Sequence, residues 1–178
     1  MEELSLHILD IVQNSVKAQA DTVFITVCED EKNDVLEITV TDNGCGMSKE
    51  FLSRVRDPFT TTRKTRKAGL GISLFEAAAV QSGGSFDIDS ELGKGTRVTA
   101  RFGYSSIDRA PLGDMAETAV TLISGSPDIR FVYTHIKNGS RFVLDTDELK
   151  KILGGISLSE PEVLSWIKDY VREGLINL

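Results

Sequence analysis

The stretch Val40-Thr41-Asp42-Asn43-Gly44-Cys45-Gly46-Met47 constrains the fold most, because it ends an alternating apolar strand in an acidic turn with two glycines. Side chains on a strand repeat every second residue, so Asp42 shares a face with Ile38 and Val40 and is predicted to point inward. An inward carboxylate costs several kcal/mol unless a donor meets it, and glycines let the backbone approach a flat ligand closely. The turn therefore predicts a pocket for a ligand with an amino group. An ordinary Asx-turn explains the same residues without a ligand.

The composition bounds the class of protein. A chain of 178 residues is long enough for one full domain and a small appendage, and 40% apolar with 26% charged residues is typical of a globular protein. The net charge of −7 argues against a nucleic-acid partner, because contacts to phosphates need a basic face. No apolar run approaches the ~18 residues of a membrane span, and no secretory signal pattern opens the chain. We therefore expect a cytoplasmic protein without membrane contact.

The first 20 residues predict an amphipathic helix over 3–20. His7, Asp10, Asn14 and Lys17 are spaced by three, four and three residues, so they form one polar stripe along it. Asn14 is a poor helix former at mid-helix, and its amide oxygen suits a hard cation such as Mg²⁺. Asp10 lies one turn before it and is placed to orient a water or hydroxyl beside the metal. A solvated surface stripe is the simpler interpretation of the same spacing.

Two hairpins are predicted from β-branched and alternating runs. The first joins Thr22–Glu29 to Val35–Thr41 through a short charged segment, and the second covers residues 85–102. On the return strand of the second hairpin, Thr96 occupies an inward-facing row. Its hydroxyl is therefore expected to complete the same ligand contact as Asp42.

A basic segment lies between the two hairpins. Residues 58–67 carry three hydroxyl side chains followed by four cations in five positions, so they are expected to form surface that needs an anion. Gly69-Leu70-Gly71 is then predicted to open a helix over 74–82. Free backbone N–H groups and the positive end of a helix dipole favour a polyphosphate at such a helix start. The same glycines are also explained as ordinary loop residues without a role in ligand binding.

As a set, these segments resemble the motifs of one ATPase superfamily, over about residues 3–103 and in the same order. It includes the catalytic domain of sensor histidine kinases, type II topoisomerases, mismatch-repair ATPases, heat-shock chaperone ATPases and serine-kinase anti-sigma factors. Asp10–Ala18 resembles the N box, Asp42–Met47 the G1 box, Pro58–Thr62 the F box, Gly69–Ser73 the G2 box and Gly93–Thr96 the last motif.

The resemblance implies an α+β fold, a two-layer sandwich of helices on a mixed β-sheet with ATP between the layers. In it Asp42 would accept a hydrogen bond from the adenine amino group, Thr96 would support that contact through water, and Asn14 would hold Mg²⁺. Gly44, Gly46 and Met47 would shape the adenine floor. Further ATP contacts are implied in the lid and the G2 box at Phe59, Thr61, Thr62, Arg63, Lys64, Lys67, Gly69, Leu70 and Gly71.

The chain departs from the sensor-kinase pattern near its start. Only 13 residues precede Asn14, too few for a phosphoacceptor helical domain. Asp10 stands where the hydrolysing and serine-phosphorylating branches carry a carboxylate, more often Glu. Asp10 is thus a candidate general base with a shorter reach, or an orienter of metal-bound waters.

The sequence predicts a division into an ATP-binding domain at 1–104 and a small helix-hairpin-helix-helix module at 105–178. In this module Trp166 and Tyr170 are expected to pack internally or to form a docking face for an unidentified protein partner. A homodimer is a further possibility. Two functions stay open: phosphoryl transfer from Mg-ATP to a protein or water, and an ATP-dependent binding switch without turnover.

Overall fold

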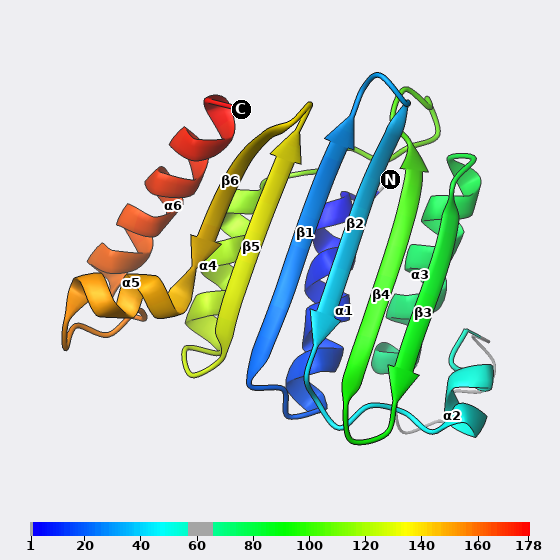
Figure 1. Cartoon of the computed structure of the whole chain (residues 1–178), viewed down its shortest axis with the longest axis horizontal. Helices are drawn as coiled ribbons and strands as arrows, with labels where there is room; N and C mark the ends of the chain where they lie inside the picture. The colour runs from blue at the N-terminus through cyan, green and yellow to red at the C-terminus, as the bar shows by residue number, and fades with distance from the viewer. Residues whose placement is uncertain (1, 57–65) are drawn as a thin grey trace.

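The computed structural model describes residues 2–56 and 66–178, with only the backbone at 66–69. Its described strands form one mixed six-stranded sheet in the order β3-β4-β2-β1-β5-β6 (Figure 1). Neighbouring strands are antiparallel except β1 and β5, which are parallel. The strands are β1 (Thr22–Asp30), β2 (Val35–Asp42), β3 (Ser85–Glu91), β4 (Gly95–Gly103), β5 (Arg130–Lys137) and β6 (Ser140–Asp145).

The main helices lie on one side of this sheet. Figure 1 shows α1, α3 and α4 behind the strands, with α6 beyond the β6 edge. This arrangement confirms the predicted two-layer α+β sandwich. The described helices are α1 (Leu4–Lys17), α2 (Lys49–Arg54), α3 (Arg66–Gln81), α4 (Met115–Gly125), α5 (Thr146–Leu153) and α6 (Pro161–Ile176).

The core lies between the helices and the sheet because both present one apolar face. On β2 the alternating Leu36, Ile38 and Val40 are buried, and on α1 the residues at helical spacing are buried as well. Phe75 of α3 is fully buried against the rings of Phe86 and Phe102. The strand that carries Asp42 is therefore held in place by its buried side chains at the centre of the core.

The C-terminal strands continue the sheet of the N-terminal part. β5 pairs with β1 from Thr22 opposite Arg130 to Glu29 opposite Lys137, although about 100 residues separate them in sequence. Strands from both sides of the predicted boundary at 104/105 thus belong to one sheet. The division into two separate units stays a prediction.

A buried polar chain crosses the seam between β1 and β5. An ionised carboxylate only accepts hydrogen bonds, so His135 Nε2 donates to Glu29 Oε1 at 2.6 Å. The other ring nitrogen, Nδ1, lies 2.6 Å from the Tyr133 hydroxyl. Burial raises the pKa of Tyr133, so its hydroxyl keeps its proton. The hydrogen bond from His135 is the main reason that the pKa of Glu29 is lowered.

No helix in the ranges 2–56 and 66–178 combines the length and apolar character that a membrane crossing requires.

Candidate functional site

The carboxylate of Asp42, at the end of β2, is held at both oxygens. Oδ1 accepts from the backbone N–H of Gly44 at 2.9 Å, and Oδ2 accepts from the hydroxyl of Ser15 on α1 at 2.6 Å. Asp42 thus faces the helix layer, as its place in the alternation predicts, and lies directly opposite Thr96 of β4. The Asx-turn that the sequence left open is present, but it uses only one of the two oxygens.

The turn after Asp42 is tied to the connection between α1 and β1. Asn43 Oδ1 accepts from the backbone N–H groups of Asp21 and Thr22 at 2.9 and 3.0 Å. Cys45 donates its N–H to the carbonyl of Ala18 at 2.9 Å. The turn is therefore a rigid part of the fold rather than a free loop.

The two glycines of the turn lie where the backbone passes close to other segments. A Cβ at Gly44 would come within 2.7 Å of the Ala18 Cβ, at the end of α1. Gly46 has a φ of +69°, and a Cβ there would come within 2.1 Å of the Glu91 carbonyl oxygen. Within the structure these glycines serve close packing of the turn, and an adenine floor built from them stays a prediction.

Ser90 is a residue of this region that the sequence reasoning missed. Its hydroxyl accepts from the Met47 N–H at 2.8 Å, donates to the Gly95 carbonyl at 2.9 Å, and lies 2.9 Å from the Thr96 hydroxyl. Ser15 was missed in the same way. Each hydroxyl lies on a face that is otherwise apolar and points inward. A polar residue in such a row is the signal in the sequence that could have identified both.

Asp10 and Asn14 lie one turn apart on α1. Asn14 is half-buried, and its side-chain amide makes no hydrogen bond within the described part of the chain. Asp10 is exposed at its carboxylate, but α3 passes close to its base: a Cβ at Gly71 would lie 3.3 Å from the Asp10 Cβ. Partial burial raises the pKa of Asp10, against the opposing influence of His7.

His7 does not belong to a solvated stripe. Its side chain is only 6% exposed and stacks on the Phe75 ring with 5.4 Å between centroids. Burial lowers the pKa of His7, and its Nδ1 has no hydrogen-bond partner among the residues that the structure describes. The predicted polar stripe therefore reduces to Asp10, Asn14 and Lys17.

Helix α3 corrects the prediction for the glycine-rich segment. The helix begins at Arg66, so Gly71 is its sixth residue and Gly69 its fourth. The expectation that Gly69-Leu70-Gly71 opens the helix is wrong, because the helix already begins at Arg66 and Gly71 lies beyond its first four N–H groups. Leu70 is 40% exposed, and its contact with ATP, like those of Gly69, Gly71 and Lys67, stays a prediction.

Most residues of the predicted lid are not among those that the structure describes. The residues that lie outside the described ranges are Phe59, Thr61, Thr62, Arg63 and Lys64.

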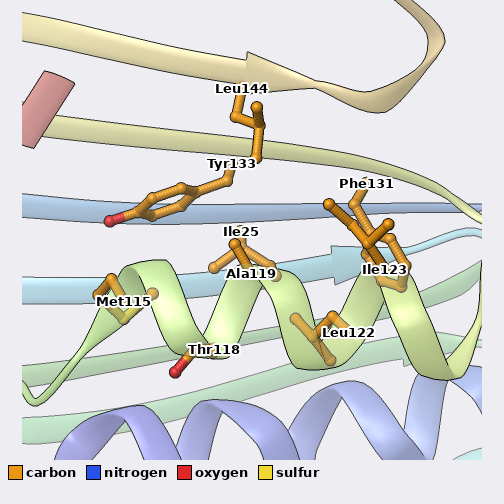
Figure 2. A pocket seen from close by; sticks show the side chains of 9 residues that line it. All are labelled: Ile25, Met115, Thr118, Ala119, Leu122, Ile123, Phe131, Tyr133 and Leu144. Carbon is orange, nitrogen blue, oxygen red and sulfur yellow. The ribbon is translucent and has the colours of Figure 1, made fainter. Parts of the chain in front are cut away.

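A small apolar pocket lies elsewhere, between α4 and the C-terminal half of the sheet. Figure 2 shows side chains of α4, β1, β5 and β6 around it, and the pocket shares no residue with the Asp42 or Asp10 regions. Apart from the hydroxyls of Thr118 and Tyr133, its lining side chains are apolar, so it is a gap in core packing rather than a chemical site. The lining residues are Ile25, Met115, Thr118, Ala119, Leu122, Ile123, Phe131, Tyr133 and Leu144.

Comparison with known proteins identifies the N-terminal part of the chain. Residues 2–105 match the model of the family described as histidine kinase-, DNA gyrase B- and HSP90-like ATPases. The histidine protein kinase DivJ of Caulobacter vibrioides is 38% identical over 98 residues, which cover 53% of this chain and 16% of that protein. A putative sensor protein of Shewanella frigidimarina is 31% identical over 109 residues, which cover 60% of this chain and 17% of that protein.

The matched segments thus cover less than a fifth of the length of either relative. Among solved structures, the N-terminal domain of a DNA repair protein matches with a TM-score of 0.50 and 13% identity, over 82% of this chain and 53% of that one. At that identity the likeness is one of fold. The match of residues 2–105 confirms the predicted family: this part is an ATP-binding, histidine-kinase-like domain, and the chain belongs to the family of histidine kinase-, DNA gyrase B- and HSP90-like ATPases.

Proposed function

We propose that the protein binds Mg-ATP between α1 and the Asp42 turn and transfers the γ-phosphate to a partner protein or to water in signalling or regulation. The observation that carries this proposal is the fixed carboxylate of Asp42, opposite Thr96 and joined through Ser15 to the helix that bears Asp10 and Asn14.

Asp42 has the free capacity that an adenine amino group needs. Each carboxylate oxygen offers about two acceptor positions, and one on each is used by Ser15 or Gly44. The remaining lone pairs are held in a fixed direction, so the free-energy cost of aligning an exocyclic amino group with them is small. The hydroxyls of Ser90 on β3 and Thr96 on β4 lie next to each other. Together they support a water beside the base.

Asn14 and Asp10 suit the metal and the transferred phosphate. The amide oxygen of Asn14 is not engaged by the described chain, and an oxygen ligand is what Mg²⁺ prefers. Mg²⁺ supplies neutralisation of the phosphate charge when bound. Asp10 acts as the general base on a water or a partner's hydroxyl, because a raised pKa makes a carboxylate a better proton acceptor than an ordinary surface Asp.

The C-terminal segment is the proposed contact region for a cytoplasmic protein partner, including a second copy of the chain. Trp166 and Tyr170 on α6 stack with 5.3 Å between ring centroids and are 47% and 40% exposed. Aromatic side chains of this size dominate protein interfaces when they become covered.

Asp10→Asn tests the catalytic part of the proposal. The variant is expected to bind Mg-ATP as the parent does and to lose phosphate release and transfer by about 100-fold or more, because general-base catalysis contributes that much. The assay follows ATP labelled at the γ-phosphate, with binding measured by calorimetry. Gln13→Ala, an exposed change on the same helix, is the matched control and should leave turnover intact.

A parent protein that binds Mg-ATP without any turnover would contradict the catalytic role and support the alternative function, an ATP-dependent binding switch. A variant that binds and turns over ATP like the parent would remove Asp10 from the mechanism.

A further inference from the structure

Helix α1 has no N-terminal cap of its own. Its N-cap residue Glu3 makes no side-chain cap hydrogen bond, although the first N–H groups of a helix lack partners within the helix. The backbone carbonyls of Pro111 and Leu112 fill this role: Leu4 N–H donates to Pro111 at 2.9 Å and Ser5 N–H donates to Leu112 at 2.8 Å. The helix that bears Asp10 and Asn14 is thus capped by the connector between β4 and α4, which passes beside the N-terminus of the chain (Figure 1).

We call residues 110–113 the strap, and its contact with α1 is tight. Leu4, Ser5 and Ala110 are at most 5% exposed. Gly113 has a φ of +89°, and a Cβ there would lie 2.3 Å from Ser5 Oγ and 2.5 Å from Glu3 Oε2. A methyl group at Gly113 would therefore meet the side chains of Ser5 and Glu3 at the start of α1, and these side chains would have to move.

The far end of the strap is anchored in the C-terminal segment. Asp114 follows it directly and caps α4, since its Oδ1 accepts from the Glu117 N–H at 2.9 Å. The other carboxylate oxygen of Asp114 pairs with Arg172 of α6 at 3.1 Å, and Lys168 of α6 pairs with Glu117. A shift of α4 and α6 would consequently pull on the strap.

The opposite end of α1 is anchored in the Asp42 turn. The Ala18 carbonyl accepts from Cys45 N–H at 2.9 Å, and Ser15 donates to Asp42. Asp10 and Asn14 lie between the two anchored ends of this helix. A rigid helix held at both ends transmits a displacement at one end to the groups along it.

We propose that the strap is a positioning segment for the nucleotide site, through which the C-terminal segment sets the affinity for Mg-ATP. This inference rests on the proposed Mg-ATP site. In this proposal, the strap holds α1 in the position where Asn14 and Asp10 face the nucleotide.

Two glycines of the chain allow a matched test. Gly113 and Gly139 share a φ of +89°, so an alanine carries the same backbone strain at either position. A Cβ at Gly139 meets nothing within 4 Å, whereas at Gly113 it clashes with the side chains of Ser5 and Glu3 at the start of α1. Dissociation constants for Mg-ATP and for ATP without metal are measured at a temperature where both variants are folded, as judged by their melting curves.

Gly113→Ala is expected to weaken Mg-ATP binding about tenfold relative to Gly139→Ala. The loss should be smaller for ATP without Mg²⁺, because Asn14 lies on the helix whose start the added methyl group disturbs. The double variant Ser5→Ala/Gly113→Ala removes the closest clash and should recover part of the affinity. Equal affinities of Gly113→Ala and Gly139→Ala, with a parent that binds Mg-ATP, would overturn the strap inference alone. A parent that does not bind Mg-ATP would overturn the proposed function.

A measurement on the parent protein does not depend on the variants folding. Because coupling is reciprocal, Mg-ATP should slow hydrogen exchange at the amides of Leu4 and Ser5, which are the ones that the strap holds. Unchanged exchange at these two amides, together with protection around Asn14, would contradict the inference.

Discussion

At the scale of single residues, the site depends on how one carboxylate is held. The sequence predicted that Asp42 and Thr96 each point inward, because alternation fixes both directions, whereas the pairing of β2 with β4 sets them opposite each other. It did not predict Ser15 or Asn43 as partners. Ser15 meets Asp42 across 27 positions of sequence, so only the packing of α1 on the sheet brings these two groups together. Asn43 accepts from the backbone of Asp21 and Thr22, which the pairing of β1 with β2 places beside it.

Ser15→Ala tests whether this fixation matters for nucleotide binding. Loss of the hydroxyl leaves Asp42 Oδ2 without its 2.6 Å donor, so the carboxylate can turn. We expect ATP affinity to fall about tenfold, while the free energy of unfolding falls by about 1 kcal/mol, the usual worth of such a hydrogen bond. Isothermal calorimetry and urea unfolding measure the two effects.

Ser82→Ala is the control for the same substitution, since Ser82 is another buried serine with a hydrogen-bonded hydroxyl, at 2.8 Å from the Ala79 carbonyl. It should lose stability without losing ATP affinity. An undiminished affinity in Ser15→Ala would show that Asp42 needs no fixing by α1.

At the scale of elements, local signals predicted most helices and strands but not their long-range partners. The two N-terminal hairpins and helix α1 follow from alternation and periodicity, which neighbouring residues determine. The start of α3 was misplaced because Gly69 and Gly71 suggested a break, whereas the structure tolerates both within the helix. The pairing of β5 with β1 leaves no local trace, and neither does the strap on α1.

The seam between β1 and β5 predicts a defined response to acid. Glu29 has a lowered pKa in the folded state, so its stabilising effect is complete above the ordinary value of 4.5 and is lost as pH falls through the lowered value. Glu29→Gln should therefore cost about 2 kcal/mol of unfolding free energy at pH 7. The difference from the parent should shrink below about pH 4. Urea unfolding across pH gives both numbers.

Glu91→Gln is the matched control, because Glu91 pairs with Lys94 on the surface, where both side chains are about 70% exposed. Its cost should stay below about 1 kcal/mol at either pH. A Glu29→Gln cost that is the same at pH 7 and pH 3 would contradict the assigned direction of the pKa shift.

At the scale of the whole molecule, one sheet and one helix connect the two ends of the chain. β5 and β6 extend the sheet of the ATP-binding domain, and the strap joins α4 to α1. The C-terminal segment, which the sequence suggested to be an appendage, thus helps to build the N-terminal part. If the proposed partner binds α6, these connections are the route by which it would act on the proposed nucleotide site.

The most direct test of the account is the thermal shift of the parent and of Asp42→Asn with Mg-ATP. Ligand at about a hundred times its dissociation constant stabilises a protein by about 2.7 kcal/mol, which raises the melting temperature by several degrees in a chain of this size. The parent should show this shift, Asp42→Asn should lose it while still melting cooperatively, and Asp89→Asn, an exposed residue on β3, should keep it. An equal shift in Asp42→Asn and the parent would contradict the assignment of Asp42 to the adenine.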